Sequence, residues 1–151
     1  RQRGAHFLGR RHFGQRQQTH AGILDALRLA RVLARHPRLR LIVAHFGLPE
    51  YVEFLDLAEK YDGVLLDTTM AFTDFFGGIE LPDRERKRIA EFEERILFGS
   101  DFPNIPYPYA EALESLARLD FGDAWLRAVC HGNAARVFGL AAQPAQPAQA
   151  S

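Results

Sequence analysis

The 151-residue sequence has a single cysteine, Cys130, which excludes an internal disulfide framework and is typical of a reducing compartment. No apolar run reaches the roughly 18 residues that a membrane-spanning helix needs. The first residues lack the apolar segment of a signal peptide. We therefore expect a cytoplasmic protein. The sequence opens on Arg1 and not on an initiator methionine, so we expect a fragment of a longer protein.

Net charge is absent as well, because 19 basic side chains balance 19 acidic ones. The chain as a whole therefore gives no case for a nucleic-acid or membrane partner. The charges are unevenly placed, since residues 1–20 contain five arginines and no acid. This segment could be a nucleic-acid arm, a loop whose arginines bind an anionic substrate, or a solvated loop at a truncated end. The last of the three is favoured, because no aromatic interleaving or folded motif supports the first.

Apolar residues make up 47% of the sequence and charged residues 25%, as in ordinary soluble domains. Short apolar runs alternate with amphipathic segments, which predicts an α/β fold with parallel strands and right-handed crossovers. A complete (β/α)₈ barrel needs about 250 residues, more than this chain has. We expect strands at 39–45, 64–68 and 95–100, and helices at 20–36, 49–61, 82–94, 109–119, 123–131 and 133–139. Pro49 is expected as the first residue of its helix, and Asp123 as an N-cap.

The segments outside the alternating region have different compositions. Residues 1–19 form the basic loop, whereas 20–140 contain the alternating strands and helices. Residues 141–151 are a low-complexity Ala/Gln/Pro stretch with too few apolar groups to pack, and we expect a disordered tail.

Each predicted strand ends on a residue that can bind a metal or transfer a proton: His45, Asp67 and Asp101. Parallel barrels place their active sites at the carboxyl ends of strands. By the period of two, His45 shares a face with Leu41 and Val43, and Asp101 shares one with Leu97 and Gly99. If those faces point into a barrel, His45 and Asp101 reach the same cleft. We expect Val43, Leu65 and Leu97 to line the interior face.

Each of these residues also has a purely structural interpretation. His45 could be a satisfied core or capping residue, and Asp101 could start the turn before Pro103. Asp67 is the weakest candidate, since it could simply hydrogen-bond the loop that follows it. The position of all three at one end of a parallel sheet favours the functional interpretation.

With these residues identified, the chain resembles the C-terminal half of an amidohydrolase-related protein. Its motifs are similar to those of aminocarboxymuconate-semialdehyde decarboxylase, resorcylate decarboxylase and related lactone hydrolases. The resemblance rests on residues 38–47 (Arg-Leu-Arg-Leu-Ile-Val-Ala-His-Phe-Gly), 64–68, 96–103 (Ile-Leu-Phe-Gly-Ser-Asp-Phe-Pro) and 132–140, which contain Asn-Ala-Ala-Arg. It implies a TIM-like (β/α)₈ barrel, of which this chain supplies strands six to eight.

The resemblance also implies the roles of two residues. Asp101 would ligate a divalent metal, with zinc the expected ion, and handle the proton of the metal-bound water or substrate. His45 would contact the substrate or act as acid and base beside the metal. The family's His-x-His pair is absent, because no two histidines here have that spacing. This chain alone is therefore not expected to hold a competent metal site.

Taken together, these patterns predict a fragment of a metal-dependent hydrolase or decarboxylase acting on a small, carboxylated or cyclic organic substrate. The alternative is a non-catalytic half-barrel that binds or assembles. A nucleic-acid-binding domain is the weakest of the three. The expected protein partner is the missing N-terminal half or a second copy of the chain.

Overall fold

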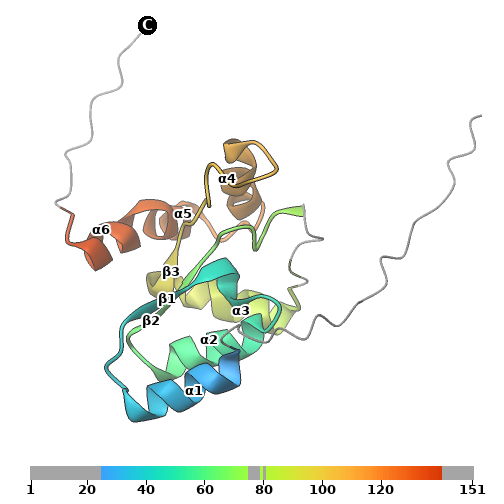
Figure 1. The fold of residues 1–151 in the computed structure, drawn as a ribbon. Coiled ribbons are helices and arrows are strands. Elements are labelled where there is room, and N and C mark those ends of the chain that lie inside the picture. The colour runs from blue at the N-terminus through green and yellow to red at the C-terminus, as the bar shows by residue number, and fades with distance from the viewer. Residues whose placement is uncertain (1–24, 75–78, 80, 141–151) are drawn as a thin grey trace, which may run out of the picture.

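The computed structural model of the chain describes residues 25–74, 79 and 81–140, and contains one short sheet with helices packed against it (Figure 1). Helices and strands alternate along the chain, as the sequence predicts. In chain order the elements are α1 (Ala26–Arg35), β1 (Leu41–Val43), the 3₁₀ turn η1 (Ala44–Gly47), α2 (Tyr51–Lys60), β2 (Val64–Asp67), α3 (Asp83–Glu91), the 3₁₀ turn η3 (Glu93–Arg95), β3 (Ile96–Leu97), α4 (Tyr109–Ala117), α5 (Asp123–Arg127), the π turn η4 (Ala128–Gly132) and α6 (Asn133–Phe138).

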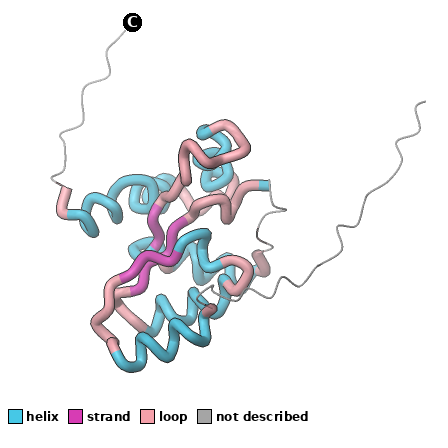
Figure 2. The backbone as a smooth tube through the Cα atoms, viewed as in Figure 1, coloured by secondary structure: helices cyan, strands magenta, loops and turns pink. Residues whose placement is uncertain are grey.

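The three strands form a parallel sheet in the order β1-β2-β3, so strands consecutive in the sequence are neighbours. Val43 of β1 lies opposite Leu66 of β2, which lies opposite Ile96 of β3. α2 connects the first pair of strands and α3 the second. Figure 2 shows how short the strands are beside the helices. The prediction of parallel strands joined by helices is confirmed.

One face of the sheet packs against the helices. Val43, Leu66 and Ile96 belong to the main apolar core, together with buried residues of α1 to α5 such as Leu55 and the fully buried Trp125. Val43 therefore points toward the helices. The expectation that it lines a barrel interior is wrong, because the strand register places it on the face that α2 covers.

The other face carries the alternate residues of each strand. Leu65 and Leu97 are buried but lie outside the main core, and Ile42, beside Leu65 in the register, is 40% exposed. Asp67 lies opposite Leu97, so its side chain belongs to this second face. In a (β/α) barrel one face of each strand meets the helices and the other faces the interior, so Asp67 lies on the interior side.

β1 and β3 are markedly shorter than the sequence predicts. Each ends where a backbone N–H donates to an acceptor other than the neighbouring strand's carbonyl. After β1, the N–H of His45 donates to the carboxylate of Asp67 instead of continuing the ladder. After β3, the N–H of Phe98 donates to the carbonyl of Val129 in η4. His45 and Asp101 consequently lie beyond their strands, and the period of two does not extend to either residue.

Several helix ends also differ from the prediction. α1 begins at Ala26, after Asp25, whose carboxylate accepts the N–H of Arg28 at 2.7 Å as an N-cap. α2 begins at Tyr51, so Pro49 precedes it. Asp123 is the first residue of α5 and not its N-cap. Gly122 takes the cap position with φ 89°, a conformation that favours glycine. The helix expected over 123–131 becomes α5 followed by the π turn η4.

The basic loop 1–19, the tail 141–151 and the first residues of the predicted helix 20–36 lie outside the described residues, so those predictions stay predictions. Within the described part of the chain, no helix has both the length and the apolar character required to cross a membrane.

The Asn-Ala-Ala-Arg segment fixes the start of β3. The amide of Asn133, which is buried, donates to the carbonyls of Glu93 at 2.7 Å and Ile96 at 2.8 Å. Arg136 donates to the carbonyl of Glu94. Two side chains from α6 thus satisfy three carbonyls around η3 and β3, which places the strand that leads to Asp101.

Candidate functional site

His45 lies on the turn η1, immediately after β1, and not on a strand. Its backbone is left-handed, with φ 54°, and so is that of Phe46, with φ 55°, and of Gly47, with φ 76°. Non-glycine residues rarely adopt this conformation. Phe46 is fully buried, and its ring packs edge-on against Phe72 with 5.1 Å between the centroids. The buried ring therefore anchors the turn that carries the exposed His45.

Asp67 ties the ends of β1 and β2 together. Its Oδ1 accepts the backbone N–H of His45 at 3.0 Å and the backbone N–H of Thr69 at 2.9 Å. The imidazole Nδ1 of His45 lies 3.3 Å from the carbonyl oxygen of Thr69. One oxygen of the Asp67 carboxylate thus binds the backbone of both His45 and Thr69, the residues whose ring and carbonyl lie next to each other.

The end of β3 packs directly against this arrangement. A Cβ placed on Gly99 would lie 2.2 Å from Oγ1 of Thr69 and 3.1 Å from Cγ of Asp67. The N–H of Gly99 also donates to the hydroxyl of Thr68 at 3.2 Å. Gly99 therefore occupies a crowded position, and the group that crowds it is the side chain of Thr69.

Asp101 begins the turn that follows. Its φ is 53°, its carbonyl accepts the N–H of Asn104 at 2.7 Å, and its side chain is exposed. The next residue, Phe102, packs its ring edge-on against Tyr109 at the start of α4, with 6.2 Å between the centroids. The turn is therefore held from one side by its own hydrogen bond and from the other by an aromatic contact with a helix.

His45 and Asp101 thus follow β1 and β3, and Asp67 is the last residue of β2, so all three lie at the carboxyl end of the sheet. The backbone N–H of His45 bonds to the carboxylate of Asp67, and the side chain of Asp67 lies beside Gly99, two residues before Asp101. His45 also lines a hollow of about 710 Å³ beside α2, together with Leu48 and Glu50, and Asp101 is not among its lining residues. That His45 and Asp101 open onto one cleft stays a prediction.

The described residues do not fit a metal ion by themselves. Structural and catalytic zinc sites use three or four side-chain ligands. Within the ranges that the structure describes, no group of three His, Cys, Asp or Glu side chains is placed to hold one. His45 and Asp101 can contribute at most two ligands, so any complete site must draw on residues outside this set.

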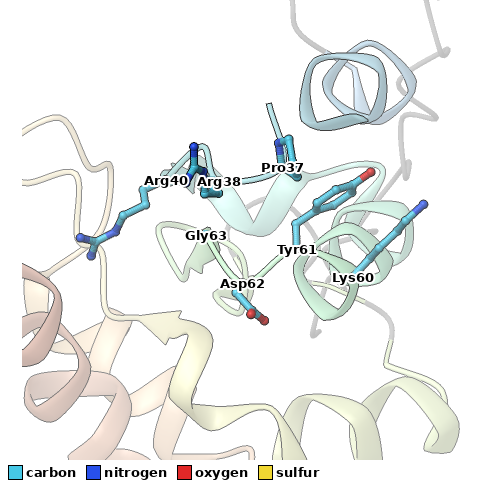
Figure 3. A pocket seen from close by; sticks show the side chains of 7 residues that line it. All are labelled: Pro37, Arg38, Arg40, Lys60, Tyr61, Asp62 and Gly63. Atoms are coloured by element: carbon cyan, nitrogen blue, oxygen red, sulfur yellow. The ribbon is translucent and has the colours of Figure 1, made fainter. Parts of the chain in front are cut away.

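A second hollow, of about 500 Å³, lies at the opposite end of the sheet, where β1 and β2 begin. Figure 3 shows that the side chains of Arg38, Arg40 and Lys60 there point in different directions instead of toward one point. The carboxylate of Asp62 in the same hollow pairs with Arg95 at 2.9 Å. Because these cations diverge, they do not chelate a small anion, and the candidate site is at the other end.

Cys130 is not a candidate for the chemistry of the site. Burial raises the pKa of the Cys130 thiol, which keeps it protonated and supports a packing role over a nucleophilic one.

Sequence reasoning missed Thr69, whose carbonyl lies next to the histidine ring and whose side chain fills the space beside Gly99. The available signal was Gly99 itself, because a glycine at a strand end indicates a close neighbour.

Parallel strands alternating with helices, with acid–base side chains at their carboxyl ends, are the arrangement found in (β/α) barrels. The family model described as amidohydrolase matches residues 12–140. The chain therefore belongs to the amidohydrolase family. This assignment is broader than the resemblance to decarboxylases and lactone hydrolases that its motifs suggest. A search of curated proteins finds no match.

Solved structures show the same fold. An uncharacterised TIM-barrel protein from Bordetella bronchiseptica is 24% identical, with a TM-score of 0.60 over 76% of this chain and 39% of its own. An amidohydrolase from Burkholderia multivorans with bound zinc is 22% identical, with a TM-score of 0.55 over 77% of this chain and 49% of its own. A Pseudomonas putida protein, provisionally named a 2-pyrone-4,6-dicarboxylic acid hydrolase, is 19% identical, with a TM-score of 0.53 over 76% and 48%. The chain thus spans less than half the length of these three structures.

Proposed function

We propose that this chain supplies the carboxyl-terminal strands of an amidohydrolase-family enzyme that acts on a small, carboxylated or cyclic organic molecule. The observation that carries the proposal is the meeting of three strand ends. Asp67 accepts the N–H groups of His45 and Thr69, and Gly99, two residues before Asp101, packs against Thr69 and Asp67. Hydrolysis is favoured over loss of a carboxyl group, because one structural neighbour carries the name of a pyrone dicarboxylic acid hydrolase.

In this proposal His45 and Asp101 contact the reacting molecule. His45 is exposed, and with Nδ1 directed at the carbonyl of Thr69, its Nε2 is the nitrogen free to meet a substrate. Asp101 is an exposed carboxylate on a turn closed by its own backbone hydrogen bond. Exposed acid–base groups on braced turns suit general acid–base catalysis, which requires a positioned proton donor or acceptor.

The remaining parts of the barrel come from outside the described residues. Among those residues β1 is an edge strand, and Ile42 on its interior face is partly exposed. We infer that the preceding barrel half, or a second copy of the chain, pairs with this edge. A divalent metal, with zinc the first candidate because one neighbour binds it, would take Asp101 as one ligand and the others from that partner.

The experiment compares the chain alone with the longest open reading frame that contains it. Both are assayed for hydrolysis of 2-pyrone-4,6-dicarboxylate and for carbon dioxide release from hydroxybenzoates, and both are analysed for zinc. We expect turnover and zinc in the longer protein only. In that protein, Asp101→Ala should lower turnover at least about 100-fold and remove zinc, whereas His45→Ala should lower turnover about 100-fold with zinc retained.

The matched control is Asp62→Ala, which removes a carboxylate at the far end of β2 and should leave turnover and zinc unchanged. If Asp101→Ala keeps its zinc and near-normal turnover, Asp101 does not have the proposed role. If the longer protein converts none of these substrates and binds no zinc, the non-catalytic alternative, a half-barrel that binds or assembles, gains support instead.

A further inference from the structure

We propose that Asp67 is a positioning residue that sets the tautomer of His45, by clamping the backbone of His45 and the backbone of Thr69 on one carboxylate oxygen. The consequence is that, whenever the imidazole is neutral, its proton lies on Nδ1 and its lone pair on Nε2. This inference rests on the proposed function, in which Nε2 of His45 meets the substrate, and it adds the residue that holds the ring in that state.

The first step of the argument is the chemistry of the two atoms at the ring. Nδ1 of His45 faces the carbonyl oxygen of Thr69 at 3.3 Å. A carbonyl oxygen can only accept a hydrogen bond, so Nδ1 has to be the donor. In a neutral imidazole, a proton on Nδ1 leaves Nε2 without one, and the partner of one ring nitrogen is known to fix the state of the other.

The second step is that the ring contact depends on the backbone around it. At 3.3 Å the bond is slightly longer than the usual range for N–H···O bonds, so small displacements of either loop remove it. The two loops are 24 residues apart in the sequence and share no β-ladder at this point. Oδ1 of Asp67 accepts an N–H from each of them, at 3.0 and 2.9 Å, and therefore fixes their separation.

The third step is that the residues next to the clamp are buried. Thr69 is buried, and its side chain fills the space that a Cβ on Gly99 would occupy. Phe46, which follows His45, is fully buried against Phe72. Hydrogen bonds to a carboxylate are stronger than neutral ones, and packing on both sides limits the alternatives open to the loops. Asp67 thus acts on the ring through backbone atoms and not by touching it.

The test is the ¹⁵N spectrum of the histidine rings in the ¹⁵N-labelled chain, at a pH at which the imidazoles are neutral. His45 is assigned by the signals that disappear in His45→Gln. In the unmodified chain we expect the Nδ1 shift typical of a protonated ring nitrogen and the Nε2 shift of an unprotonated one. This measurement needs no variant of Asp67, so a proton found on Nε2 overturns the proposal outright.

The variants separate positioning from general support of the fold. Asp67→Asn keeps an oxygen that accepts both N–H groups, and it should preserve the Nδ1–H tautomer. Asp67→Ala removes that oxygen, and the two ¹⁵N shifts should move toward each other as the tautomers mix. The control Asp62→Ala, an exposed aspartate before the same strand, should change neither shift.

If Asp67→Ala is folded by circular dichroism and keeps the Nδ1–H signature, Asp67 does not set the tautomer. If the signature is present but the longer reading frame has no enzymatic activity, the clamp stands and the proposed function fails, so the two conclusions can be told apart.

Discussion

His45 and Phe46 occupy a backbone conformation that disfavours side chains, and they do so at the point where the candidate site begins. Their φ angles are 54° and 55°, inside the left-handed region where a Cβ crowds the carbonyl. Sequence patterns carry no signal for such a turn in non-glycine residues. The sequence therefore predicted the position of His45 at a strand end but not its orientation. The hydrogen bond that orients it joins residues 22 apart, which no local pattern reveals.

This strain leads to a prediction at the residue scale. His45→Gly removes the left-handed penalty and should raise the free energy of unfolding by about 0.5–1 kcal/mol, although it also removes the ring contact with Thr69. The matched control is Asp120→Gly, because Asp120 has φ 55° in an exposed turn after α4. Urea unfolding measures both. A loss of stability in His45→Gly alone would show that the ring contact outweighs the strain.

At the scale of the elements, the alternation of strands and helices was predictable because its signals are local. Apolar runs, Pro37 and the Asp62-Gly63 turn mark the segments, and all three strands lie where expected, although each is shorter, β2 by a single residue. The strand ends were not predictable, because each is set by a partner distant in sequence. Phe98 leaves the sheet for Val129, and Asn133 bonds to the carbonyls beside β3.

Asn133 gives a prediction at this scale. Asn133→Ala leaves the carbonyls of Glu93 and Ile96 without their amide donor, and it should lower the free energy of unfolding by about 1–3 kcal/mol. Arg136→Ala serves as the comparison, because Arg136 is exposed and also bonds to a carbonyl of η3, and its cost should be smaller. Urea unfolding of both variants measures the difference. Equal costs would mean that burial of the Asn133 bonds has no effect.

At the scale of the molecule, the described residues form a sheet with two unlike faces and an edge strand. The match to the barrel fold covers less than half of each structural neighbour, and β1 ends the sheet on one side. The sequence predicted an uncovered apolar face but assigned Val43 to it. The structure places Val43 among the helices and Ile42 on the partly exposed side. Because side chains alternate along a strand, this difference of one residue exchanges the two faces of β1.

The two faces predict opposite effects of the same substitution. We expect the isolated chain to self-associate through the open side of β1, and Ile42→Lys should reduce the mass measured by light scattering with little change in stability. Val43→Lys places a charge in the core and should prevent folding. An unmodified chain that remains monomeric at high concentration and binds no hydrophobic dye would argue against an uncovered face.

The left-handed turn at His45 also bears on how this protein could be engineered. A library of variants selected only for heat resistance is expected to enrich glycine at position 45, because the selection rewards a relaxed backbone and ignores the imidazole. Residues at which the most heat-resistant replacement is also the least active would then outline the site. A second selection, for both thermal survival and turnover in the assembled protein, would give the comparison. Positions that differ between the two sets of variants would be the functional ones.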